Sequence, residues 1–263
     1  MAPLSYHSNP FELIRPGING LKPNVLVYFL TLLSYIAVFF VVFAVAFVSA
    51  SAVPALALVF VPLSLILFIS YLILPFYRLT LASAKHQSMP LGEAFRPDVA
   101  LSWKFFGTQI LSALFIILGF IALIVPGVIL VGRYALVPYI VLEEGTTGWA
   151  ALQRSSELVR GHLVESWGTL GLSSATNIFA LIPFVGPILT AVASLLLLPV
   201  IALRYLELVA LKSNQAVDAV KPAVSGWNYV AIVVALVAGG ASSYHSYTLN
   251  HAQNTTIQYN NNY

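Results

Sequence analysis

Long apolar stretches separated by short polar segments dominate the pattern of this chain. Residues 23–77, 105–132 and 166–203 contain no Asp, Glu, Lys or Arg. A helix needs about 20 apolar residues to cross the hydrocarbon core of a membrane, so the first and third stretches each have room for two helices. The pattern predicts an all-α protein, a polytopic transmembrane helical bundle.

Proline and glycine mark the expected turns between paired helices. The predicted turns lie at residues 49–54, 125–127 and 182–187, and the fourth span is short and ends near Leu142. These turns give six core helices in three hairpins over residues 25–211. Cleavage of a signal peptide at residues 49–52 is the alternative for the first turn, but the apolar run before it exceeds the usual length of about 7–15 residues.

Both ends of the chain differ from this core. Residues 1–24 form a polar N-terminal segment, and residues 226–241 are apolar enough for a probable seventh span. Residues 242–263 are rich in Asn, Thr and Tyr and lack Asp, Glu, Lys and Arg, so they are predicted to form a disordered polar tail.

The composition agrees with a membrane protein. Of the 263 residues, 59% are hydrophobic and 8% are charged, whereas soluble domains carry about 25% charged residues. The absence of cysteine excludes disulfides, thiolate metal sites and cysteine nucleophiles. No soluble segment has the clustered Lys and Arg that nucleic-acid binding requires.

The distribution of the twelve Lys and Arg residues predicts the topology. They lie in the N-terminal segment, in three polar loops and once inside the fourth span, and the hairpin tips carry none. The positive-inside rule therefore places the N-terminus and these loops in the cytoplasm. The C-terminus is outside if the seventh span crosses the membrane and inside if it does not.

The hairpins also show a weak internal repeat. The second helix of each hairpin has one proline near its start and another 12 or 13 residues later. Prolines are common in membrane helices, so a triplicated hairpin and chance remain alternatives. The pairs are Pro62 and Pro75, Pro126 and Pro138, and Pro187 and Pro199.

Residues 119–167 carry a resemblance to a known family. They contain the motif of residues 124–127, then Arg133 and Tyr134, Pro138, the segment 143–145 and the polar segment 150–162. This part resembles the YciC-like bacterial inner-membrane proteins, which are similar to the membrane domain of some glycerophosphoryl diester phosphodiesterases. The resemblance extends loosely over residues 20–211. It implies a six-helix core in the bacterial cytoplasmic membrane and little about activity; the seventh span and the tail depart from that pattern.

Arg133 is the one ionisable residue between apolar runs. A charge at the centre of a bilayer costs about 2.5–3.5 kcal/mol, so Arg133 is expected to face the bundle or water. One interpretation is a contact with an anion or a lipid phosphate, because the guanidinium group matches phosphate oxygens. The alternative is a structural arginine that reaches the interface or binds a carbonyl.

Residues 146–162 are predicted to form an amphipathic helix at the membrane interface, capped by Thr146 or Thr147. Arg154, Arg160 and His162 could hold anionic headgroups, with Arg154–Glu157 and Glu157–Arg160 at ion-pair spacing. The alternative is a solvated face on a connecting helix. The expected buried face is Trp149, Leu152, Ser156, Val159 and Leu163.

The fifth and sixth spans carry further polar side chains. Ser173, Ser174, Thr176 and Asn177 favour helix–helix packing through small residues and hydrogen bonds over a substrate pathway. Arg204 and Glu207 have the spacing of a local ion pair.

No enzymatic signature accompanies these residues. The histidines are scattered without a metal-binding spacing, and no P-loop or nucleophile elbow is present. The chain is therefore predicted to be a non-enzymatic envelope or membrane-organising protein, without cofactor or metal, that binds lipids, membrane proteins or a second copy of itself. The alternative is a small transporter or flippase-like protein for an anionic or lipid substrate, which the interrupted helices and Arg133 favour. An enzyme acting on lipid phosphodiesters is a distant third.

Overall fold

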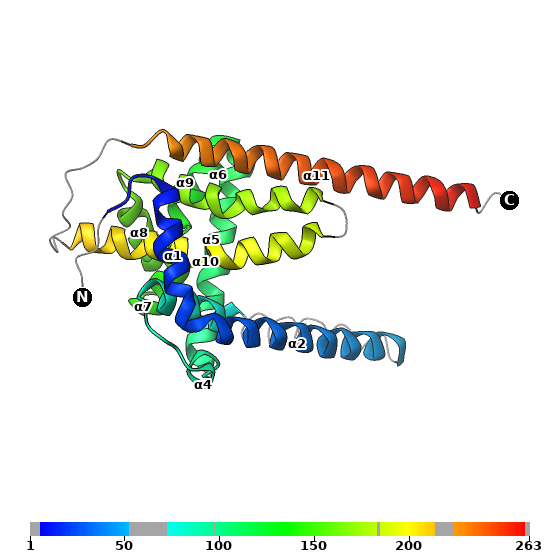
Figure 1. Ribbon diagram of the computed structural model, residues 1–263, viewed down its shortest axis with the longest axis horizontal. Helices are drawn as coiled ribbons and strands as arrows, with labels where there is room; N and C mark the ends of the chain where they lie inside the picture. Colours follow the sequence, from blue (N-terminus) through cyan, green and yellow to red (C-terminus); the bar gives the residue numbers. More distant parts are fainter. Residues whose placement is uncertain (1–5, 53–72, 97, 183–184, 214–223, 261–263) are drawn as a thin grey trace. The chain divides into compact units, whose positions relative to one another are not determined.

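The computed structural model describes residues 6–52, 73–96, 98–182, 185–213 and 224–260, and all regular structure in these ranges is helical (Figure 1). The chain divides into two compact units. The N-terminal unit comprises residues 16–161. The C-terminal unit comprises residues 1–15 together with residues 162–263. Each unit is described by itself.

The N-terminal unit holds most of the short helices. Residues 73–84 are also helical in this unit. Helix α1 (Ile14–Leu21) contains the boundary between the units. The other elements are the 3-10 helix η2 (Lys22–Asn24), α2 (Val25–Ala52), α4 (Leu91–Ala94), α5 (Val99–Ala122), α6 (Ile124–Tyr134), α7 (Val137–Glu143) and α8 (Gly148–Val159).

The C-terminal unit is built from three longer helices and two 3-10 helices. Helices α9, α10 and α11 run alongside one another (Figure 1). The bounds are η1 (Pro10–Leu13), α9 (Leu163–Ser174), η3 (Ala175–Leu181), α10 (Gly186–Lys212) and α11 (Trp227–Asn260).

Three helical stretches of the described chain are long and apolar enough to cross a membrane: Ala100–Ala122, Ile124–Glu143 and Val192–Lys212. A shorter apolar helix covers Trp227–Ser243. The predicted all-α class with apolar membrane-length helices is thus confirmed at this level. The number of six core helices stays a prediction, because residues 53–72 lie outside the described part.

The predicted turns are reproduced with shifts. Helix α2 continues to Ala52, so residues 49–52 are helical rather than a turn, while Val53 and Pro54 lie outside the described residues. Around the third turn, η3 ends at Leu181 and α10 begins at Gly186, as predicted; residues 183 and 184 are not described.

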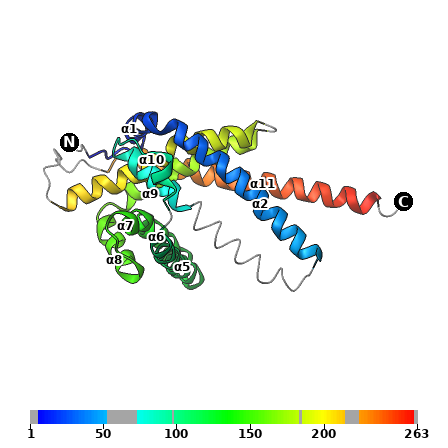
Figure 2. The ribbon, with the colours of Figure 1, turned by 90° about the horizontal axis from the view of Figure 1, so that it is seen from below.

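Helices α5 and α6 lie side by side (Figure 2), and the turn between them lies earlier than residues 125–127. Helix α5 ends at Ala122, Leu123 alone is extended, and α6 starts at Ile124. Gly127 serves close packing instead of bending the chain. A Cβ atom there would lie 2.4 Å from the ring of Phe120, and one at Gly119 would lie 3.0 Å from the Cα of Gly127.

The fourth span is interrupted, whereas the sixth is continuous. Helix α6 ends at Tyr134 and α7 begins at Val137, with Pro138 in its first turn. Pro199, by contrast, lies inside α10 without ending it. The second prolines of the proposed repeat therefore do not share one local structure. Pro62 lies outside the described residues.

Helix α8 confirms the predicted amphipathic helix but not its buried face. Leu152 and Val159 are buried as expected, whereas Trp149 is exposed. Thr147 occupies the cap position without a side-chain hydrogen bond; instead, the N–H of Gly148 donates to Thr108 Oγ1 of α5 at 2.8 Å. The contacts of α8 with α5 and α6 determine which of its residues are buried. The buried residues of α8 are Ala151, Leu152, Ser155, Leu158 and Val159.

Helix α11 packs against α9 and continues past the predicted seventh span. A Cβ atom at Gly171 would lie 2.8 Å from the carbonyl oxygen of Ala231, so the two backbones are nearly in contact. The structure corrects the prediction of a disordered tail over residues 242–260, which belong to α11. These residues include no Pro and no Gly, so nothing interrupts the helical hydrogen bonds.

Candidate functional site

The four predicted site residues fall in different units. Arg133, Arg154 and Arg160 belong to the N-terminal unit and His162 belongs to the C-terminal unit. The two groups are therefore described separately.

Arg133 is exposed in the last turn of α6. Its side chain does not face the interior of its unit, which contradicts one of the two expected orientations. Its backbone carbonyl accepts a hydrogen bond from the buried Ser155 Oγ at 2.6 Å. This bond fixes α8 against α6 at the level of Arg133.

Arg154 has a different partner from the one predicted. Its Nε lies 3.0 Å from Glu144 Oε2, across the turn that joins α7 to α8. The two helices pack together, which brings Glu144 closer than helical spacing alone suggested. Lys85 and Glu143 form a second exposed ion pair at 2.5 Å. Arg160 is exposed at the end of α8, where its N–H donates to the carbonyl of Glu157.

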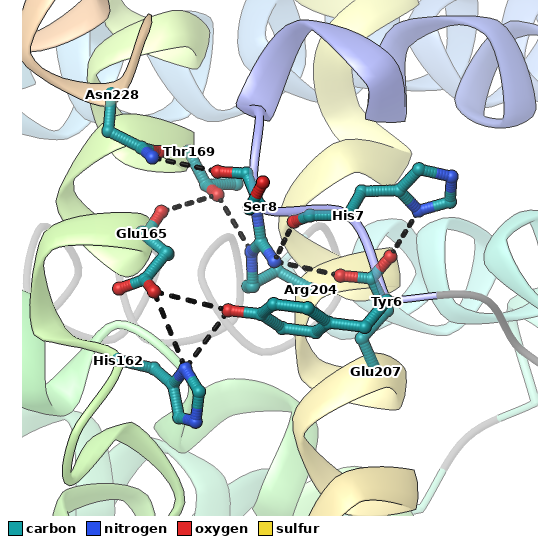
Figure 3. Close-up of polar contacts among 9 residues, drawn as sticks. All are labelled: Tyr6, His7, Ser8, His162, Glu165, Thr169, Arg204, Glu207 and Asn228. Atoms are coloured by element: carbon teal, nitrogen blue, oxygen red, sulfur yellow. Dashed lines mark hydrogen bonds and ion pairs between the residues drawn. The ribbon is translucent and has the colours of Figure 1, made fainter. Parts of the chain in front are cut away.

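A buried polar network lies at one end of the C-terminal unit (Figure 3). Its centre is Arg204 of α10, whose side chain is 1% exposed. The Arg204 Nη1 donates to Glu207 Oε2 at 2.8 Å, which confirms the predicted local ion pair. The Arg204 Nε donates to Thr169 Oγ1 of α9 at 3.1 Å. Arg204 thereby ties α10 to α9 through buried, charge-assisted hydrogen bonds.

The N-terminal segment closes over this arginine. The Arg204 Nη1 also donates to the carbonyl of His7 at 2.7 Å, and the guanidinium carbon lies 5.5 Å from the centre of the Tyr6 ring. Asn228 of α11 donates through Nδ2 to the carbonyl of Ser8 at 2.7 Å. Two consecutive backbone carbonyls thus attach residues 6–8 to α10 and α11.

His7 completes the interaction with Glu207. Its Nδ1 lies 2.6 Å from Glu207 Oε1, and the carboxylate is buried. The hydrogen bond to Glu207 is the main reason why the pKa of His7 is raised above its ordinary value of 6.5, although partial burial works against this effect. Protonated His7 and Arg204 therefore share one buried carboxylate.

His162 and Glu165 form the other end of the network. Tyr6 Oη lies 2.9 Å from His162 Nδ1 and donates to Glu165 Oε1 at 3.3 Å. Burial pushes the pKa of Glu165 upward, but hydrogen bonds and the charge of Arg204 outweigh it, so the pKa lies below its ordinary value. Burial also raises the pKa of the Tyr6 hydroxyl, so Tyr6 stays protonated and can donate.

These contacts favour a structural role for His162 over the predicted headgroup contact. Its ring nitrogen is shared between Tyr6 and Glu165 within the same unit. The network carries two carboxylates and one arginine, so a proton on His7 balances the buried charge. It can therefore hold or release protons at the point where residues 6–8 attach.

The sequence interpretation did not identify Tyr6, Glu165, Thr169 or Asn228 as partners. One signal was present: Glu165 lies 19 residues before position 184 and Arg204 lies 20 residues after it. In an antiparallel hairpin with its tip there, the two residues reach the same level. No comparable signal in the sequence connects Tyr6 or Asn228 to this level.

The docking of residues 6–8 is expected to weaken as the pH rises. A raised pKa in the folded state means that His7 contributes stability fully below pH 6.5 and loses this contribution as the pH passes its folded pKa. The melting temperature of the wild type should therefore fall, relative to that of His7→Gln, by a few degrees between pH 6 and pH 9. Differential scanning fluorimetry in detergent measures this difference.

Glu93→Gln serves as the control, because Glu93 is an exposed carboxylate of the N-terminal unit and takes no part in this network. Its melting temperature should follow that of the wild type across the range. A constant difference between wild type and His7→Gln at every pH would contradict a titrating contact.

The described residues contain no group of three or more His, Asp or Glu side chains close enough to hold a metal ion. The geometry of the network suits attachment of the N-terminal segment, and the exposed arginines suit contact with an anion. Comparisons with models of protein families, with curated proteins and with solved structures find no match to this chain.

Proposed function

We propose that the chain is a non-enzymatic, multi-pass membrane protein that binds anionic lipids through exposed arginines of its N-terminal unit. The observation that carries this proposal is the position of Arg133, exposed where an exposed apolar surface ends. Acyl chains match the apolar surface, and phosphate groups match guanidinium groups.

The apolar surface follows α5 and α6. Exposed apolar residues recur along α5 from residue 110 onward and continue into the start of α6. Soluble monomers rarely expose a continuous apolar surface of this size to water, which supports contact of this surface with lipid. The residues are Ile110, Leu114, Ile117, Leu118, Phe120, Ile121, Leu123, Ile124, Val125 and Val128.

The cations beside this surface support an anionic ligand. Arg133 is exposed on α6, and Arg154 and Arg160 lie on the outer side of the neighbouring α8. Arg154 is partly neutralised by Glu144, so the binding of an anion depends mainly on the exposed Arg133. Arginines next to a membrane attract anionic headgroups by roughly 1 kcal/mol each.

The cellular location belongs to the same proposal. The resemblance of residues 119–167 to YciC-like proteins and the positive-inside rule support a bacterial cytoplasmic membrane with the N-terminus in the cytoplasm. A role in organising the envelope, with other membrane proteins or a second copy as partners, is consistent with the lack of catalytic motifs in the sequence.

Replacing Arg133 with leucine is expected to remove bound anionic lipid. Native mass spectrometry of protein released from nanodiscs should show phosphatidylglycerol adducts on the wild type and at least a several-fold lower adduct population on Arg133→Leu. Lys104→Leu is the matched control, because Lys104 is an exposed cation of the same unit. It should retain the adducts. Equal adducts on all three folded proteins, or none on the wild type, would contradict the proposal.

Transport of an anionic substrate is the second candidate. The break between α6 and α7, directly after Arg133, favours it because interrupted helices build the substrate sites of many transporters. The polar residues of the fifth span do not add to it: Thr176 Oγ1 lies 3.0 Å from Ser194 Oγ of α10 and so joins two helices. Uptake by proteoliposomes that depends on Arg133 would favour transport over binding alone.

A further inference from the structure

The hairpin of α5 and α6 has an apolar tip and a polar base. Leu123 joins the two helices, and Gly119 and Gly127 allow their backbones to approach closely just below it. The side chains around the tip are strongly exposed, as the values of 68% for Leu123 and 73% for Ile124 show. No charged residue occurs between Phe105 and Gly132.

The polar base is fixed by helix α8. Ser155 Oγ binds the carbonyl of Arg133, the N–H of Gly148 binds Thr108 Oγ1, and the Trp149 ring lies 5.1 Å from that of Phe115. Helix α8 therefore lies beside α5 at residues 108–115 and beside α6 at Arg133. Its exposed residues there are Trp149, Ala150, Gln153, Glu157 and Arg160.

The distance from base to tip matches one leaflet. Arg133 follows Leu123 by ten residues, which corresponds to about 15 Å along a helix. The hydrocarbon core of a bilayer is about 30 Å thick. If the tip reached the far surface, the exposed Arg133 and the polar face of α8 would lie near the centre of the bilayer, where charges are strongly disfavoured.

The apolar stretch that continues after Arg133 does not face lipid. Val137, Ile140 and Val141 of α7 are 0% exposed, and Tyr139 packs against Tyr77 with ring centres 5.4 Å apart. This part of Ile124–Glu143 is apolar because it forms the core of the N-terminal unit. The apolar composition of Ile124–Glu143 therefore overstates the length of helix that can contact lipid.

The turn at the tip suits a site without water. The N–H of Leu123 donates to the carbonyl of Gly119 at 3.0 Å, and the N–H of Gly127 donates to the carbonyl of Leu123 at 3.4 Å. Pro126 has no N–H to satisfy. These two bonds and the proline lower the number of backbone groups at this turn that need a partner, which favours a position inside hydrocarbon.

We infer that the α5–α6 hairpin enters one leaflet of the bilayer without crossing it, so that Arg133 and the exposed face of α8 lie at the level of the lipid phosphates. The occupants of the apolar tip are the acyl chains of that leaflet. The inference rests on the proposed membrane function and gives it a definite geometry: the anionic group at Arg133 belongs to a lipid of the leaflet that the hairpin enters.

The chain has no cysteine, so single-cysteine variants of the full-length protein test this directly. Ile124→Cys places a thiol at the tip, Gln153→Cys places one on the exposed face of α8, and Val185→Cys places one at the tip between η3 and α10. Each variant is reconstituted into phosphatidylethanolamine–phosphatidylglycerol vesicles. It is then labelled from either side with a membrane-impermeant maleimide, and separately with a nitroxide for depth measurement.

The positive-inside rule puts the tip between η3 and α10 outside and the charged loops inside, so Gln153→Cys is expected to label from one side and Val185→Cys from the other. Ile124→Cys should label at least tenfold more slowly from both sides, and its nitroxide should report a depth near the bilayer centre. Labelling of Ile124→Cys from the side of Val185→Cys would show a crossing hairpin and overturn the inference. Rapid labelling from the side of Gln153→Cys would overturn it as well, since the hairpin would then lie in water.

Failure of the underlying proposal has a different signature. If all variants left the vesicles in an alkaline wash, the chain would not be integral to the membrane, and the proposed function would fail together with the inference. If the protein stayed in the membrane and only the tip labelled from the far side, the proposed function would stand and the one-leaflet geometry alone would be wrong.

Discussion

Replacing Arg204 with methionine is expected to destabilise the protein by about 3–5 kcal/mol, because it removes the guanidinium group from the buried carboxylate of Glu207. Thr169 loses a donor as well, and the carbonyl of His7 loses its hydrogen bond. Thermal unfolding in detergent, followed by circular dichroism, measures the loss. Lys104→Met is the control, since it removes an exposed cation and should change the melting temperature little.

A double variant separates the loss of a charge partner from the loss of packing. In Arg204→Met with Glu207→Gln, the buried carboxylate next to Arg204 is also removed, so the double variant should be more stable than Arg204→Met alone. A double variant that is less stable by the sum of the two single effects would show that the charges act independently, and would contradict a coupled network.

Substituting leucine for Gly171 is expected to separate α11 from α9. Its Cβ atom would lie 2.8 Å from the carbonyl oxygen and 2.9 Å from the carbonyl carbon of Ala231, which are backbone atoms that cannot rotate away. Overpacking of this kind costs about 1–3 kcal/mol or more. Hydrogen–deuterium exchange over residues 227–243 should become faster, because α11 loses its close packing against α9.

Gly239→Leu is the matched control on α11 itself. A Cβ atom at Gly239 meets nothing within 4 Å, so leucine there leaves the α9–α11 contact intact. Exchange over residues 227–243 should stay near the wild-type rate. Equal exchange in Gly171→Leu and Gly239→Leu would mean that the close approach of the two helices does not hold α11 in place.

Both predictions concern contacts between elements that are distant in the sequence. Contacts of this kind could not be predicted from the sequence, whereas features that depend on residues close in the sequence could. The pattern of charge-free stretches predicted apolar helices, because a membrane-crossing helix needs about 20 apolar residues whichever helices it packs against. The ion pair of Arg204 and Glu207 was predictable for a similar reason: it depends only on helical spacing.

Two features differ from their predicted form because they depend on packing between helices rather than on short-range sequence patterns. Residues 125–127 have the composition of a turn, yet α6 starts before them, since Pro126 fits the first turn of a helix and Gly127 is needed for packing on Phe120. Arg154 has suitable spacing to Glu157, but the packing of α7 on α8 gives it Glu144.

Residue types and their periodicity establish that this chain is helical, that its helices are apolar enough for a membrane and that its charges gather in a few segments. The folded structure was needed to show that one network joins Tyr6, His162, Glu165, Arg204 and Asn228. It was also needed to show that the apolar residues of α7 are core while those of the α5–α6 tip are surface. The reason is physical. An apolar side chain can be buried against protein or against lipid, and a polar side chain can pair with any group of opposite charge or complementary hydrogen-bonding type. Burial and pairing therefore depend on which helices pack against one another.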